Sequence, residues 1–156
     1  MDDTPIFKCW VCHEVIANPT WDLSRNVQKF GTDIWEGKAR ETINTLLSQQ
    51  MFVYDSQECW HLHEPAVASE LKLKTTHPSS SPFTPCCRCG TAVDRSLPHI
   101  SYAITAMNLQ EAPDGWLGEV IDSKEFAVLC RDCEEPDEPA AEAVAEYENQ
   151  TERTSA

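Results

Sequence analysis

Apolar and polar residues partly alternate along residues 99–109, the pattern of a strand that buries one face. The positions that share this face are Ile100, Tyr102, Ile104 and Ala106. Two further apolar stretches, 116–122 and 125–130, flank Ser123-Lys124, a polar break of hairpin length. The pattern predicts a three-stranded sheet in residues 99–130.

The first half of the chain has a different periodicity. Within residues 36–50, positions at helical spacing form one face, and charged residues lie elsewhere. That face consists of Ala39, Ile43, Leu46, Leu47 and Gln50. We expect an amphipathic helix here, followed by a hairpin made of residues 51–55 and 59–63. A helix that leads into a two-stranded wing also occurs in winged-helix proteins, whereas the simpler alternative is a helix packed on a sheet.

A stretch rich in proline and serine separates the two halves of the chain. Residues 66–85 contain the stretch THPSSSPFTP and have no apolar period, which indicates a linker. We expect a helix-and-hairpin module at 1–65, a second module at 86–136 and an acidic, flexible tail at 137–156. The expected fold class is α+β, with two tandem small modules stabilised by zinc.

The charge of the chain limits its partners. The formal net charge is −14, and residues 134–156 carry eight acidic side chains against Arg153 alone. An acidic protein repels the phosphate backbone that supplies most nucleic-acid affinity, so direct nucleic-acid binding is disfavoured. No stretch approaches the roughly 20 apolar residues of a membrane span, and no secretory signal is present. We expect a cytoplasmic protein that does not enter membranes.

Eight cysteines in a reducing compartment favour metal binding over disulfides. Six of them form three Cys-x-x-Cys pairs, and the strongest combination joins Cys86 and Cys89 to Cys130 and Cys133. Two such pairs supply the four thiolates of a tetrahedral zinc site. Rubredoxin-like iron uses the same ligands, but zinc is the commoner occupant.

These paired turns and the hairpin between them resemble the zinc-ribbon group of structural zinc folds over residues 86–133. The resemblance implies an architecture rather than a family function. If the chain contains an internal repeat, the same zinc-ribbon-like architecture is expected in residues 9–63. Val-x-Asp-Ser-x-Glu occurs at both 53–58 and 120–125, and aligning these motifs matches His63 with Cys130.

The first Cys-x-x-Cys pair, Cys9 and Cys12, needs two further ligands from Cys59, His61 and His63. In a strand all three would point the same way, with neighbours roughly 6.7 Å apart and the outer two roughly 13 Å apart at Cα. The repeat alignment favours His61 and His63. Cys59 with His61 is the second choice, and a bent chain joining Cys59 to His63 is the third. Two zinc ions are expected in all.

Catalysis is disfavoured because closed four-ligand sites are normally structural. The segments Cys12-His13-Glu14 and Pro85–Cys89 formally match a zinc deaminase, but that enzyme would leave three cysteines unused. The preferred function is a non-catalytic adaptor, regulator or inhibitor that binds a protein with a basic surface, such as a nucleic-acid-handling protein. The alternative is a zinc-ribbon or winged-helix nucleic-acid-binding regulator of transcription, contacting phosphates through Arg88, Arg95 and Arg131.

Overall fold

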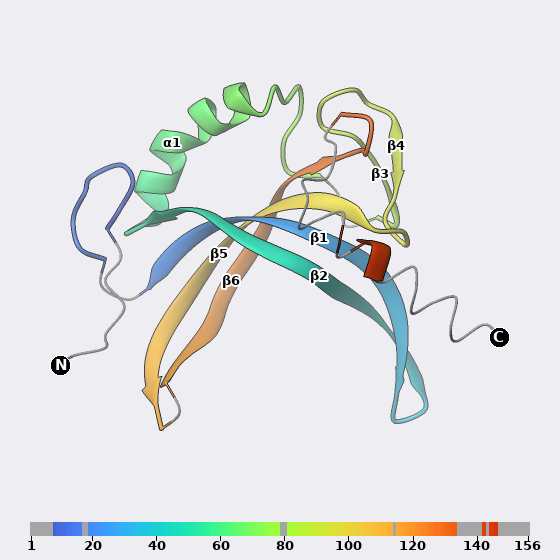
Figure 1. The fold of residues 1–156 in the computed structure, drawn as a ribbon, viewed down its shortest axis with the longest axis horizontal. Coiled ribbons are helices and arrows are strands. Elements are labelled where there is room, and N and C mark those ends of the chain that lie inside the picture. Colours follow the sequence, from blue (N-terminus) through green and yellow to red (C-terminus); the bar gives the residue numbers. More distant parts are fainter. Residues whose placement is uncertain are drawn as a thin grey trace.

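The fold is built on one four-stranded antiparallel sheet with the order β2-β1-β5-β6, seen in a computed structural model (Figure 1). The structure describes residues 8–16, 19–78, 81–113, 115–133, 142 and 144–146. Its elements are β1 (Thr20–Trp35), β2 (Lys38–Tyr54), α1 (Gln57–Glu70), β3 (Phe83–Pro85), β4 (Ala92–Asp94), β5 (His99–Ala112) and β6 (Gly115–Leu129). The short strands β3 and β4 form a separate hairpin.

The expected α+β fold of two tandem modules is wrong, because strands from both halves of the chain belong to the same sheet. β1 pairs antiparallel with β5, so that Leu23 lies opposite Ile104. The described residues are mostly strand, and α1 is the one full helix among them. Each half contributes a long hairpin, and Figure 1 shows the tips of these hairpins diverging below α1.

The helix expected at 36–50 is also wrong, since residues Lys38–Tyr54 form β2. A two-residue turn at Glu36 and Gly37 joins β1 to β2, and both residues have positive φ, 52° and 78°. This conformation suits a tight hairpin whose turn matches the twist of its strands. Pairing along the whole of β1 outweighs the helical period of residues 36–50. The winged-helix alternative is lost with that helix.

The strand expected at 99–109 is confirmed as β5, but the hairpin expected at Ser123-Lys124 is wrong. β6 runs unbroken through both residues and pairs with β5 from end to end. The second hairpin therefore has two long strands instead of the three short strands that the polar break suggested.

Residues 59–63, expected as a strand, lie in the first half of α1. Ser56 caps this helix, because its hydroxyl accepts a hydrogen bond from the backbone N–H of Cys59 at 3.2 Å. Pro65 lies inside the helix instead of ending the segment. The same helix occupies residues 66–70 of the expected linker.

The core fills the space between the sheet and α1. Trp60 of α1 packs edge-on against Phe126 of β6, with ring centroids 5.1 Å apart, and also contacts Tyr54 at the end of β2. A buried ion pair between Arg95 and Glu125 joins the segment after β4 to β6. These contacts hold α1 and the β3–β4 hairpin to the sheet.

Each of the two long hairpins contains two β-bulges. On β2 the extra residues are Leu46 and Met51, and on β6 they are Ile121 and Phe126. The two extra residues are therefore spaced alike in both hairpins. Bulges bend a strand and increase its twist, so both hairpins are bent at corresponding places.

Little of the acidic tail at 137–156 is described. Glu142 and residues 144–146 are helical, and Val144 is buried in the core; the rest of the tail lies outside the described residues. Among the described helices, none is long and apolar enough to cross a membrane.

Candidate metal centres

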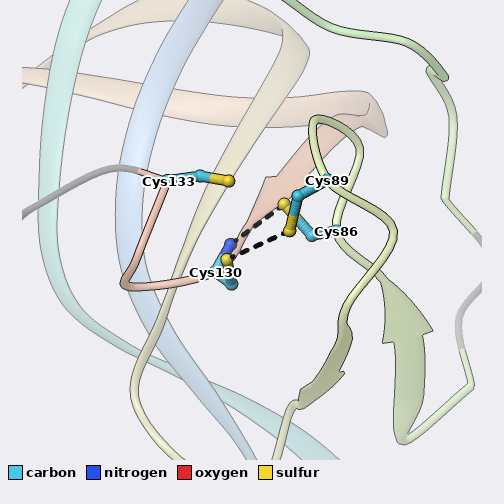
Figure 2. Close-up of side chains that lie close together, drawn as sticks. All are labelled: Cys86, Cys89, Cys130 and Cys133. Atoms are coloured by element: carbon cyan, nitrogen blue, oxygen red, sulfur yellow. Dashed lines mark hydrogen bonds between the residues drawn. The ribbon is translucent and has the colours of Figure 1, made fainter.

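Four thiols meet where the β3–β4 hairpin approaches the end of β6. Cys86 and Cys89 come from the turn after β3, and Cys130 and Cys133 come from the turn after β6. All four Sγ atoms lie within 4.8 Å of one another, and Figure 2 shows them gathered around one space. The Sγ atoms of Cys89 and Cys130 are 3.6 Å apart, close to the roughly 3.8 Å edge of a tetrahedron with metal–sulfur bonds of about 2.3 Å. This cluster, the four-cysteine site, could hold a metal ion.

A tight backbone turn brings Cys86 and Cys89 together. The N–H of Gly90 donates to the carbonyl of Cys86 at 2.9 Å, and the N–H of Cys86 donates to the carbonyl of Thr91 at 2.7 Å. Gly90 has a φ of 81°, a conformation that glycine adopts without steric cost. The backbone N–H groups of Arg88 and Cys130 both donate to Cys86 Sγ at 3.4 Å, as suits a thiolate ligand.

Neighbouring groups connect this site to the rest of the fold. Hydrogen bonding with Thr91 lowers the pKa of Cys89 to about 6, so the thiolate, which is the form that binds metals, predominates at neutral pH. The guanidinium of Arg88 donates to the carbonyl of Leu71 at the end of α1 and to the carbonyl of Cys133. A metal held here would therefore connect β6, the β3–β4 hairpin and α1.

Cys87 lies outside this cluster although it is next to Cys86. Its side chain is 2% exposed, and its sulfur accepts a hydrogen bond from the backbone N–H of Val128 at 3.4 Å. The structure therefore uses Cys87 as a small buried residue that packs against β6.

The second cluster differs from the expected set of ligands. Cys9 and Cys12 meet Asp55 and Cys59, and the four ligand atoms lie within 4.8 Å of one another. Asp55 is the first residue after β2, and Cys59 lies in the first turn of α1. This cluster, the Cys3Asp site, could hold a second metal ion.

Asp55 fits the role of a metal ligand. Its Oδ2 accepts a hydrogen bond from the thiol of Cys12 at 3.0 Å, whereas its Oδ1 is buried with no hydrogen-bond partner among the described residues. A buried carboxylate oxygen without a partner is costly, and a metal ion would satisfy it. The carboxylate also raises the pKa of Cys12 to about 12, so metal binding must displace that proton.

Asp55 also occupies the place of Cys130 in the other hairpin. Asp55 follows the bulge at Met51 by four residues, and Cys130 follows the bulge at Phe126 by four residues. The motif alignment of the sequence does not hold in the structure, because Asp122 lies in the middle of β6 whereas Asp55 follows a strand. The residue that corresponds to Cys130 in the first hairpin is therefore Asp55 and not His63.

The turn at Cys9 repeats the hydrogen bonds of the turn at Cys86. The N–H of His13 donates to the carbonyl of Cys9 at 3.0 Å, and the N–H of Cys9 donates to the carbonyl of Glu14 at 2.9 Å. His13 has a φ of 63° and stands where the other turn has Gly90. A side chain at this φ is strained.

Replacing His13 by glycine and Gly90 by alanine should change the free energy of unfolding in opposite directions. His13→Gly should stabilise the protein by about 0.5–1 kcal/mol because it removes the left-handed strain. Gly90→Ala should cost about 1 kcal/mol; a Cβ at Gly90 has no atom within 4 Å, so any loss there comes from the backbone alone. Urea unfolding of the metal-loaded variants measures both, and a stabilising Gly90→Ala would contradict the strain argument.

His61 and His63 lie outside both clusters. His61 is exposed and lies 3.1 Å from the carboxylate of Glu64. His63 is hydrogen-bonded to the hydroxyl of Tyr54 at 2.6 Å and packs against Phe52. Burial lowers the pKa of His63, which favours its neutral form. In the structure, the two histidine side chains of α1 contact Glu64, Tyr54 and Phe52.

The number of metal ions bound by each variant distinguishes the histidine ligands expected from the sequence from the ligands of the Cys3Asp site. We expect the double variant His61→Ala/His63→Ala to keep both metal ions, because neither ring belongs to a cluster. Cys59→Ser should lose one ion, since it removes one of four donors from the Cys3Asp site. Elemental analysis of the purified variants measures this, and loss of one ion from the histidine variant alone would restore the histidine ligands.

The two segments of the deaminase pattern belong to different clusters. Cys12 belongs to one cluster, and Cys86 and Cys89 belong to the other, so the two segments of the deaminase pattern do not share a site. The sequence signal that could have pointed to Asp55 and Cys59 was Ser56, a residue type that often caps helices. A capping serine indicates a helix start, and such a helix places residues 55 and 59 one turn apart.

Comparisons with known proteins gave no match, whether against protein-family models, curated proteins or solved structures.

Proposed function

We propose that the protein is a non-catalytic zinc-binding protein that acts as an adaptor or regulator by binding a partner with a basic surface. The observation that carries this proposal is that each cluster supplies four protein donors. Four donors fill the tetrahedral shell of zinc and leave no position for substrate. Thiolate-rich donor sets favour zinc over magnesium, calcium or manganese.

Charge and exposed apolar side chains support the interaction role. The chain carries a net charge of −14, which attracts basic surfaces over a long range. Leu117, Val120 and Ile121 on the edge strand β6 are between 53% and 60% exposed. Exposed apolar residues on an edge strand are characteristic of a surface that pairs with another chain.

Nucleic-acid binding is the weaker candidate. Arg88 donates its side-chain hydrogen bonds to backbone carbonyls. Arg95 is 1% exposed and paired with Glu125. Two of the three arginines expected to contact phosphate are therefore engaged inside the fold.

Affinity capture with a charge-matched control tests the proposal. The zinc-loaded protein should retain a set of basic proteins from a native lysate, and retention should weaken with salt. The same chain stripped of zinc carries the same side chains without the stabilised fold, so it controls for charge alone. Equal retention by both forms would contradict a folded binding surface. Retention of duplex DNA without basic proteins would favour the nucleic-acid-binding alternative.

A further inference from the structure

The face of the sheet that points away from α1 contains a polar groove. Leu23 and Val27 of β1 point into the core, so their neighbours Asp22, Ser24 and Asn26 point to the opposite face. There a groove of about 600 Å³ crosses all four strands of the sheet. Nine of its twelve lining residues carry a hydroxyl, amide or carboxylate group. This groove is separate from both metal clusters.

The polar side chains that form the floor of the groove are almost completely buried. Asp22, Asn26 and Gln28 on the central strand β1 are only 5%, 7% and 8% exposed. Figure 1 shows the two long hairpins diverging on the side of the sheet away from α1, and the bulges bend their strands. A bent sheet gives these side chains the walls of a binding site, whereas a flat one would leave them more open to water.

Asp22 is the one charged residue among the described residues that line the groove. Gln50 donates a hydrogen bond to Asp22 Oδ1 at 3.0 Å, and none of the lining residues is basic. Burial raises the pKa of Asp22, which means that the site disfavours an unpaired carboxylate. A cation in the groove would remove this cost.

The nearby acid Glu125 is different because the fold already pairs it. Arg95 forms an ion pair with Glu125, and Ser101 and Gln28 donate hydrogen bonds to it at 2.6 and 3.2 Å. Gln28 belongs to both the groove and this network, so its amide is held in place. Asp22 is thus the carboxylate left for a ligand.

We propose that the groove binds a lysine or arginine side chain of a partner protein, with the cation on Asp22. The hydroxyl and amide groups along the groove both donate and accept, so they can pair with the peptide groups that flank the basic residue. The groove spans four strands, which suits an extended segment better than a small free amine. A phosphate group is excluded, because the lining offers a carboxylate and no cation. This inference rests on the proposed function and locates its binding surface.

Peptide binding to the zinc-loaded full chain tests the inference. The probe is an eight-residue peptide with one central lysine among glycines and serines, compared with a peptide that has norleucine at that position. We expect Asp22→Asn to weaken binding of the lysine peptide at least tenfold and to leave the weak binding of the norleucine peptide unchanged. Isothermal titration calorimetry gives the affinities.

Asp122→Asn is the matched control. It makes the same chemical change on β6 at an exposed residue that lines a different pocket, so its effect should stay below twofold. Equal losses in both variants, or no loss in Asp22→Asn, would overturn the inference. Thr105→Lys is a second variant, which places an ammonium group inside the groove and should also abolish binding. The zinc content of each variant checks that it is folded.

The outcomes separate this inference from the proposed function. If Asp22→Asn retains basic proteins from a lysate as the wild type does, the groove is not the binding surface and the proposed function stands. If the wild type binds neither the lysine peptide nor basic proteins, both are wrong.

Discussion

Replacing Cys89 by serine is expected to release one zinc ion and to unfold the protein at room temperature. Cys89 is exposed, so the substitution removes almost no packing and isolates the loss of the ligand. Structural zinc sites in small peptides bind with apparent free energies of about 10–16 kcal/mol. A folded domain is stable by only about 5–15 kcal/mol. If the substitution releases the ion, the loss can therefore exceed the whole stability of the domain.

The expected effect is large because the four-cysteine site joins the turn after β3 to the turn after β6, which are about 40 residues apart in the chain. The β3–β4 hairpin has only three residues in each strand. Besides a bound metal, it is held by the Arg95–Glu125 ion pair, by backbone bonds such as that from Cys87 to Val128 at 2.8 Å, and by the hydrogen bonds of Arg88 to Leu71 and Cys133. Without zinc, we expect this hairpin to separate from β6.

The adjacent cysteine provides the control for this experiment. Cys87→Ser should keep both zinc ions and cost about 1–2 kcal/mol, because Cys87 is buried outside the cluster. Elemental analysis together with urea unfolding measures both variants. If Cys89→Ser keeps two zinc ions and an unchanged unfolding midpoint, the four-cysteine site does not stabilise the fold.

The second large effect is expected at Asp55. Carboxylate oxygen is a harder ligand than thiolate and suits zinc less well in a cysteine-rich shell. The Cys3Asp site should therefore give up its zinc to a chelator before the four-cysteine site does. Asp55→Cys would turn it into a second four-cysteine site, because Asp55 stands in the position of Cys130.

We expect Asp55→Cys to raise the zinc affinity of that site tenfold or more, which corresponds to about 1.4 kcal/mol. Competition with a chromophoric chelator measures the two affinities. Asp55→Asn is the control that keeps the shape and removes the charge, and it should weaken binding. Unchanged release from Asp55→Cys would show that Asp55 is not a ligand.

The cysteine spacing was sufficient to find the pairs Cys86/Cys89 and Cys130/Cys133, because a Cys-x-x-Cys turn is a local structure, and the four ligands that a tetrahedral zinc site requires joined the two pairs. The alternation of apolar and polar residues was likewise sufficient to predict the strand β5, because it is also a local pattern. The Cys3Asp site was harder, since it depends on whether residues 57–63 form a strand or a helix. The apolar pattern of CWHLH fits either one, and the helix depends on the cap that Ser56 provides for α1.

The prediction of a helix at 36–50 was wrong for a different reason. A helical period was present, but β2 is decided by the turn at Glu36-Gly37 and by pairing with β1 over its full length. The joining of the two halves could not be inferred either, because β1 pairs with β5 across about eighty residues of chain. Periodicity describes a segment alone and carries no information about such distant partners.

The pairing of β1 with β5 has a consequence for how the chain folds as it is synthesised. The ligands of the Cys3Asp site all lie within residues 9–59, so that site and the first hairpin can form early. The four-cysteine site cannot close before residue 133 has emerged, and β1 must wait for β5. Contacts between distant segments slow folding. During that interval the long flank of β1 is open to pairing with other chains, and this is when the protein should depend most on chaperones.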